Sequence, residues 1–176
     1  VSFDVAMQQL GGHTVYLSQS EVGLGQREPV ADVARVLSRY VQGIVARTYA
    51  QETLVQLAEH ASVPVINALS DDEHPCQALA DLLTIRERKG GVRGIRIAFI
   101  GDGNNVAASL AQASALAGVH FTIASPPGYR LREEVMLQVE AFARASGGSF
   151  RPVESPQEAA AGAAGTPRRR SRFARA

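Results

Sequence analysis

Short apolar runs rich in β-branched residues alternate with amphipathic segments through most of this 176-residue chain. The runs have the length of strands, whereas the segments between them carry apolar residues three and four positions apart, the spacing of one helix face. Strand, helix and strand in succession require parallel strands joined by right-handed crossovers. The sequence therefore predicts an α/β fold with parallel sheets. The expected strands are 43–48, 63–69, 96–100, 119–124 and, more weakly, 149–153, and the expected helices are 51–61, 74–89, 106–116, 132–145 and a short one from 155.

The first forty residues predict two further helices and one further strand. Residues 1–10 have helical spacing and are followed by Gly11, which can adopt the left-handed conformation that ends helices. Residues 13–17 are rich in β-branched and aromatic side chains and predict a strand, and 18–28 predict a surface loop. Pro29 opens a helix. Its expected apolar face consists of Val33, Val36, Leu37 and Tyr40.

The number of cysteines, the spacing of the histidines and the length of the apolar runs exclude several classes of protein. Cys76 is the only cysteine, so an intrachain disulfide framework is excluded and a reducing compartment is favoured. The four histidines are scattered without the spacing of metal ligands, so no metal is predicted. No apolar span of about 18 residues is present, so we predict a cytoplasmic protein without a membrane segment.

The formal charge of +1 comes from the end of the chain. Five arginines lie between residues 168 and 175, and without them the body carries +1 − 5 = −4. A mildly acidic body lacks the basic surface typical of nucleic-acid-binding domains, so no nucleic acid is predicted as a partner. Residues 164–176 are interpreted as a basic, disordered tail.

The stretch from residue 63 to residue 89 predicts a buried strand, an acidic loop and a helix that starts near His74. His74 and Gln77 are three residues apart, so their side chains share one face of that helix. Pro75 fits the first turn, where an N–H is not needed. The N–H groups at the start of the helix favour an anionic or carbonyl-bearing ligand. The residues expected to bury this helix are Leu79, Leu82, Leu83 and Ile85.

Two further places carry residues suited to binding. Arg47 ends the strand at 43–48, and open α/β sheets bind ligands at the carboxyl ends of their strands. Gly101-Asp102-Gly103-Asn104-Asn105 follows the strand at 96–100 and precedes a helix. This turn lacks the third glycine of a dinucleotide fingerprint, and the next strand does not end in an acidic residue, so NAD or FAD is not predicted.

His74-Pro75-Cys76-Gln77-Ala78-Leu79-Ala80-Asp81 closely resembles the HPxQxLAD motif of the aspartate and ornithine carbamoyltransferases. The turn at 101–105 resembles the ornithine version of a second motif of this family. The resemblance covers about residues 1–163. It implies an α/β fold of two doubly wound parallel-sheet domains, bridged by the helix from residue 74 and both incomplete here. Residues 1–90 would be the carbamoyl-phosphate-binding domain and 91–163 the ornithine-binding domain.

The resemblance also implies a reaction and a role for four residues. Carbamoyl phosphate and L-ornithine would give L-citrulline and phosphate, a step of arginine biosynthesis or catabolism, without cofactor or metal. Arg47 and His74 would donate to the carbonyl oxygen, Gln77 would hold the carbamoyl NH₂, and Asn105 would position ornithine while Asn104 caps the helix. A homo-oligomer built from trimers is expected. Arg27 is interpreted as part of an ordinary surface loop, with contact to a neighbouring subunit's site as the alternative.

Three segments of the family have no counterpart in this sequence: the STRTR phosphate loop, the Ser-Met-Gly loop and the His-Cys-Leu-Pro segment. We therefore expect this chain to be inactive or nearly so on its own. Three alternatives stay open: a non-catalytic α/β subunit for binding or assembly, a nucleotide- or sugar-phosphate-binding module using the 101–105 turn, and a carbamoyltransferase acting on putrescine or N-acetylornithine.

Overall fold

The structure is a computed structural model that describes residues 1–25 and 27–163. Within it the chain forms two compact units, which are treated separately below. The first unit comprises Val1–Ile44 and Val55–Val65, and the second comprises Val45–Leu54 and the chain from Ile66 onward. No helix in these described ranges combines the length and the apolar character needed to cross a membrane. The expected tail at 164–176 lies outside the described residues.

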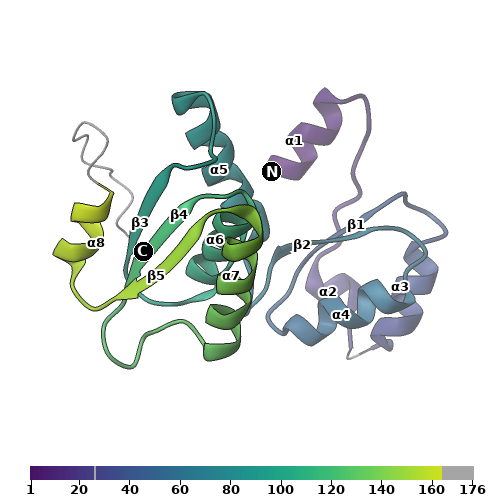
Figure 1. Ribbon diagram of the computed structural model, residues 1–176. Helices are drawn as coiled ribbons and strands as arrows, with labels where there is room; N and C mark the ends of the chain where they lie inside the picture. The colour runs from purple at the N-terminus through teal and green to yellow at the C-terminus, as the bar shows by residue number, and fades with distance from the viewer. Residues whose placement is uncertain (26, 164–176) are drawn as a thin grey trace. The chain divides into compact units, whose positions relative to one another are not determined.

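The second unit is built on a sheet of three parallel strands (Figure 1). The strands are β3 (Arg96–Ile100), β4 (His120–Ala124) and β5 (Ser149–Val153), adjacent in chain order. Helices α6 (Asn105–Leu116) and α7 (Glu133–Ser146) connect them, and α8 (Pro156–Gly162) follows. Figure 1 shows α6 and α7 on one side of this sheet and α8 on the other. The predicted α/β class with parallel sheets is confirmed.

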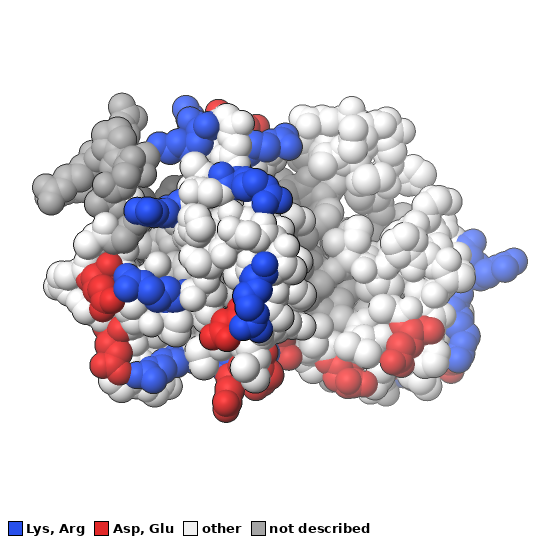
Figure 2. All heavy atoms as spheres, in the orientation of Figure 1, with Lys and Arg blue, Asp and Glu red and all other residues white. Residues whose placement is uncertain are grey.

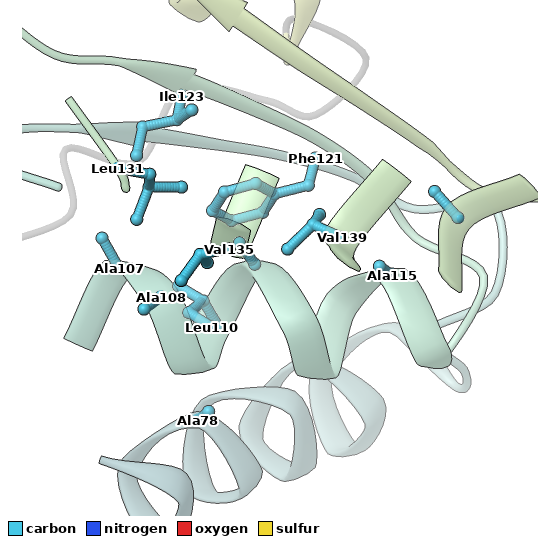
Figure 3. Close-up of a cluster of buried hydrophobic side chains, with 12 residues drawn as sticks. Ala78, Ala107, Ala108, Leu110, Ala115, Phe121, Ile123, Leu131, Val135 and Val139 are labelled. Atoms are coloured by element: carbon cyan, nitrogen blue, oxygen red, sulfur yellow. The ribbon is translucent and has the colours of Figure 1, made fainter. Parts of the chain in front are cut away.

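The core of the second unit lies between this sheet and α6 (Figure 3). Phe121 and Ile123 are two residues apart on β4 and both face α6, because side chains two apart on a strand share a face. Phe121 also stacks on Phe150 of β5, with ring centroids 6.5 Å apart. Burial of a side chain of this size contributes about 1.5–3 kcal/mol. The buried cluster comprises Ala78, Ala107, Ala108, Leu110, Ala111, Ala115, Phe121, Ile123, Leu131, Val135, Val139 and Ala143.

Helix α5 (Pro75–Lys89) packs on α6 through a smaller side chain than the sequence predicted. Ala78 is 1% exposed, whereas Leu79 and Leu83 of the expected apolar face are 63% and 46% exposed, so that expectation is wrong for both leucines. The reason is close packing: α6 presents mostly alanines, and an alanine on α5 lets the two helices approach. Gly90, at φ +77°, ends α5 as predicted, next to basic side chains that gather there in Figure 2.

Strands β1 (Ile44–Arg47) and β2 (Val65–Leu69) form a separate two-stranded sheet, and α4 (Gln51–His60) connects them. All three elements contribute residues to both units. Their positions follow the sequence prediction within two residues at each end. On α4, Leu54 and Leu57 are buried as expected, whereas Ala58 is exposed.

The first unit contains α1 (Ser2–Gln9), α2 (Gln19–Val22) and α3 (Val30–Leu37). Gly11 has φ +82°, which confirms the predicted end of α1. The predicted strand at 13–17 is wrong, because no described segment pairs with it and a strand requires a partner. Helix α2 interrupts the predicted loop at 18–28. On α3 the buried residues are Val33 and Ala34 rather than the whole predicted face, since Val36 and Tyr40 are exposed.

Candidate active site

The carboxyl ends of β1 and β2 lie together. The backbone N–H of Thr48 donates to the carbonyl of Leu69 over 3.0 Å, and that of Asp71 donates to the carbonyl of Tyr49 over 2.8 Å. The loop that follows β2 is therefore held beside the end of β1. Arg47 is the last residue of β1, and its side chain is exposed at this edge. This is the edge at which parallel α/β sheets bind ligands.

His74 caps the start of α5 without a side-chain cap bond. Its backbone N–H donates to Oγ of Ser109, 2.8 Å away on α6. In the described part of the chain, Nδ1 of the imidazole is buried and has no hydrogen-bond partner. A buried polar atom without a partner is uncommon in a folded protein and marks a group available to a ligand or a water.

Gln77 lies one turn into α5, and its side chain is exposed. Its Nε2 donates to Oδ1 of Asp81 over 3.0 Å. A carboxylate only accepts hydrogen bonds, so this partner fixes which end of the amide faces Asp81. Oε1 of Gln77 is left as an acceptor on the helix face that it shares with His74. This orientation suits an NH₂ group of a ligand.

The two asparagines at the start of α6 have different contacts. Oδ1 of Asn104 accepts from the backbone N–H groups of Val106 and Ala107, at 3.1 and 3.2 Å, which confirms the predicted cap. Nδ2 of Asn105 instead donates to the carbonyl of Ser70 over 2.7 Å. Asn105 therefore joins α6 to the segment of residues 70–74, here called the 70–74 loop. Its predicted contact with ornithine stays a prediction.

Ser70 organises the start of the 70–74 loop and is 1% exposed. Its Oγ donates to Oε1 of Gln51 over 2.6 Å and accepts from Nδ2 of Asn67 and the N–H of Glu73, both at 3.1 Å. These contacts hold the loop between the two strand ends and α5. The sequence analysis did not single out Ser70 or Gln51. A serine directly after an apolar strand gave no signal by itself, because its partners are distant in the chain.

The structure brings the surroundings of the four predicted residues together, but not the side chains themselves. Residue 47 and the 70–74 loop share one edge of the β1–β2 sheet. His74 is hydrogen-bonded to α6, and Asn105 is the first residue of α6. Among the described residues, no hydrogen bond links any two of the side chains of Arg47, His74, Gln77 and Asn105. That they face one pocket stays a prediction.

A cavity of about 290 Å³ lies elsewhere in the second unit, at the carboxyl ends of β4 and β5. None of the four predicted residues lines it. Its wall is mostly apolar, and at its rim Arg130 forms an ion pair with Glu154. The cavity therefore gives no support to the predicted site. The lining residues are Ile123, Ser125, Arg130, Leu131, Met136, Pro152, Val153 and Glu154.

Two family profiles match nearly the whole chain. Residues 1–87 match the profile described as "Aspartate/ornithine carbamoyltransferase, carbamoyl-P binding domain". Residues 93–165 match the profile described as "Aspartate/ornithine carbamoyltransferase, Asp/Orn binding domain". This chain belongs to the aspartate/ornithine carbamoyltransferase family. The resemblance seen in the motifs at 74–81 and 101–105 is thereby confirmed.

Several relatives of this chain are named ornithine carbamoyltransferase. The chain is 54% identical over 160 residues to "Ornithine carbamoyltransferase" of Acidothermus cellulolyticus, covering 91% of this chain and 51% of that protein. It is 50% identical over 163 residues to the protein of the same name from Anoxybacillus flavithermus, covering 93% and 52%. The solved ornithine carbamoyltransferase from Pyrococcus furiosus superposes with a TM-score of 0.87 at 49% identity, covering 90% of this chain and 50% of the other.

The chain thus spans about half the length of the curated relatives that it matches. The two profile matches leave residues 88–92 between them. The predicted domain limits at residues 90 and 163 stay predictions, because the compact units of the structure group the chain by packing. The descriptions of the two matched profiles name carbamoyl phosphate for the first and aspartate or ornithine for the second.

Proposed function

We propose that this chain carries the carbamoyl-transfer site of an ornithine carbamoyltransferase. The reaction moves the carbamoyl group of carbamoyl phosphate to the side-chain amine of L-ornithine and yields L-citrulline and phosphate. It belongs to arginine biosynthesis or catabolism, in a cytoplasmic enzyme built from trimers. The observation that carries the proposal is the start of α5. There His74 and Gln77 lie one turn apart with free polar atoms, in a chain 54% identical to a protein of that name.

In this mechanism the neutral amine of ornithine attacks the carbonyl carbon. The carbonyl oxygen gains negative charge, and the bond from carbon to the phosphate oxygen then breaks. Phosphate leaves with the electron pair and takes up the proton that the amine loses. Donors aimed at the oxygen lower this barrier because they stabilise charge that exists only in the transition state. Arg47 and His74 supply these donors. No metal or cofactor takes part.

The remaining two residues orient the substrates. Oε1 of Gln77 accepts from the carbamoyl NH₂, which fixes the plane of the carbonyl group. Asn105 holds ornithine at the start of α6, so that the amine approaches that plane. Holding two reactants in this way removes much of the entropic barrier of a bimolecular step. In this proposal residues 1–90 form the carbamoyl-phosphate domain and residues 91–163 the ornithine domain, so the two substrates bind to different domains.

The test is a binding and turnover experiment on the 176-residue chain. Carbamoyl phosphate should shift the NMR signals of Arg47, His74 and Gln77, whereas Leu79→Ala, a neighbouring change at an exposed position, should leave binding unchanged. Citrulline formation should be slow, because loss of one oxyanion-type donor costs about 10²–10³ in rate and this chain spans half of the family's length. Turnover at the rate of ordinary enzymes would contradict the expected inactivity.

Parallel samples distinguish the other candidates. Putrescine and N-acetylornithine are offered in place of ornithine, and a product from either one alone would reassign the acceptor. ATP and a sugar phosphate are screened by thermal shift, with NMR to locate the site. Signals that shift only at residues 101–105 with a nucleotide, and not with carbamoyl phosphate, would favour a non-catalytic binding module and contradict the proposal.

A further inference from the structure

Three polar residues form a stripe along α6, a helix otherwise rich in alanine. Asn105, Ser109 and Gln112 are spaced four and three apart, so they lie on one face of the helix. All three contact the 70–74 loop. A polar stripe on a helix packed inside a unit requires partners, since a buried polar group without one is unfavourable. The 70–74 loop supplies these partners.

The centre of the stripe is a chain of hydrogen bonds that ends at His74. Nε2 of Gln112 donates to Oε1 of Glu73 over 2.9 Å, and Oγ of Ser109 donates to Oε2 of the same carboxylate. Oγ of Ser109 in turn accepts the backbone N–H of His74 at 2.8 Å. Ser109 is 4% exposed. The serine hydroxyl therefore uses its donor and an acceptor position at once.

This chain of contacts matters because no hydrogen bond to the imidazole is present among the described residues. Nδ1 of His74 has no partner, and the side chain makes no cap bond to α5. The direction of the ring then depends on the backbone of residue 74, which has the non-helical φ −132° and ψ 63°. Ser109 accepts the N–H of His74. Ser109 and Gln112 both donate to the carboxylate of Glu73, the preceding residue.

We propose that Ser109 and Glu73 are positioning residues, which orient His74 for carbamoyl transfer by holding its backbone against α6. The assignment deepens the proposed function and rests on it for its catalytic meaning. Neither residue touches the substrate. Because the same helix begins with Asn105, α6 fixes the distance between the acceptor-binding asparagine and the imidazole that faces the carbonyl oxygen.

The test compares two serines of α6. Ser109→Ala removes the acceptor of His74 N–H and a donor to Glu73. Ser114→Ala is the matched control, since Ser114 is also buried on α6 but its Oγ has no partner among the described residues. Two readouts are taken on the 176-residue chain: the amide and imidazole NMR shifts of His74, and the affinity for carbamoyl phosphate.

Ser109→Ala should move the His74 amide signal toward that of an unbonded N–H and change the imidazole shifts. It should also weaken carbamoyl-phosphate binding by about 10- to 100-fold, because a displaced imidazole loses its hydrogen bond to a charged ligand. Ser114→Ala should leave all three unchanged. Unchanged His74 signals in Ser109→Ala would overturn the proposal, as would equal changes in both variants.

Glu73→Gln is the second variant and decides the matter if Ser109→Ala does not fold. The amide retains one acceptor oxygen but replaces the other with an NH₂, so Ser109 and Gln112 can no longer both donate to residue 73. We expect smaller shifts at His74 in the same direction, and their absence would overturn the proposal. Failure of the unmodified chain to bind carbamoyl phosphate would contradict the proposed function alone, because the His74 shifts still report the positioning.

Discussion

The first and second units differ in where their large apolar side chains lie. In the first unit, Leu10, Val15 and Tyr16 are 67–87% exposed, and α1 has no buried residue. The second unit also exposes some leucines on its outer helices, yet it buries a cluster of twelve residues that includes Phe121 and Val139.

The difference shows what layering contributes to stability. In the second unit α6 lies between a sheet and α5, so it buries side chains on two sides. Because apolar burial is the main favourable term in folding, this unit should hold most of the stability of the chain. Helix α1 and the 13–17 segment expose their apolar groups in the described structure, so changes there should have little effect. Three experiments test this contrast.

The largest difference between the units is expected when one aromatic ring is removed from each and the losses of unfolding free energy are compared. Phe121→Ala empties the centre of the second core and should lower the free energy of unfolding by about 3–5 kcal/mol. Tyr16→Ala removes a ring that is 87% exposed and should change it by less than about 0.5 kcal/mol. Urea unfolding followed by circular dichroism measures both. Equal losses would show that the first unit is as well packed as the second.

A smaller effect is expected from the helix caps. Asn104→Ala removes the side chain that caps α6 and should lower the free energy of unfolding by about 0.5–2 kcal/mol. In the first unit α3 begins at Pro29 without a side-chain cap, so it offers no such contribution. Asn104→Asp is the control, because its carboxylate keeps the acceptor. If Asp destabilises as much as Ala, the cap bond is not the cause.

The smallest effect concerns a carboxylate of the first unit. A hydrogen bond from Oγ1 of Thr14 lowers the pKa of Asp4 below its ordinary value of 3.8. Because the pKa of Asp4 is lower in the folded state, the ionised carboxylate stabilises the fold at pH values above 3.8. This stabilisation is lost as the pH falls through the folded-state pKa. Because Asp4 is only partly buried, the effect should be local.

An NMR titration of the Asp4 carboxyl carbon measures this directly. Thr14→Val should raise the pKa of Asp4 back toward 3.8. Gln8→Ala removes only a weaker contribution, the bond from Nε2 of Gln8, and should raise the pKa less. The prediction is wrong if the two variants reverse this order.

Much of the secondary structure could be predicted because its causes are local. The strand at 96–100 has the predicted limits, and Asn104 caps α6 as expected, since a short polar side chain competes for free N–H groups at any helix start. The strand at 13–17 was wrong because pairing depends on a second segment. Leu79 and Leu83 were wrong because helical spacing identifies a face but not which neighbour covers it.

The candidate site divides in the same way. The motif at 74–81 predicted His74 and Gln77 at the start of a helix, and the strand end predicted Arg47. The contacts of Ser109 with Glu73 and His74 were not predicted, although the spacing of Asn105, Ser109 and Gln112 was readable as a polar stripe. A stripe indicates that a partner exists and does not identify it.

The sequence by itself determined the order of strands and helices from α3 onward, the α/β class and the family, because these follow from apolar periodicity, helix caps and short motifs. Only the tertiary structure decided that the 70–74 loop is held against α6, with the backbone of His74 bonded to a serine 35 residues later. The physical reason is that a hydrogen bond requires two groups within about 3 Å, and which distant groups meet depends on how the helices pack.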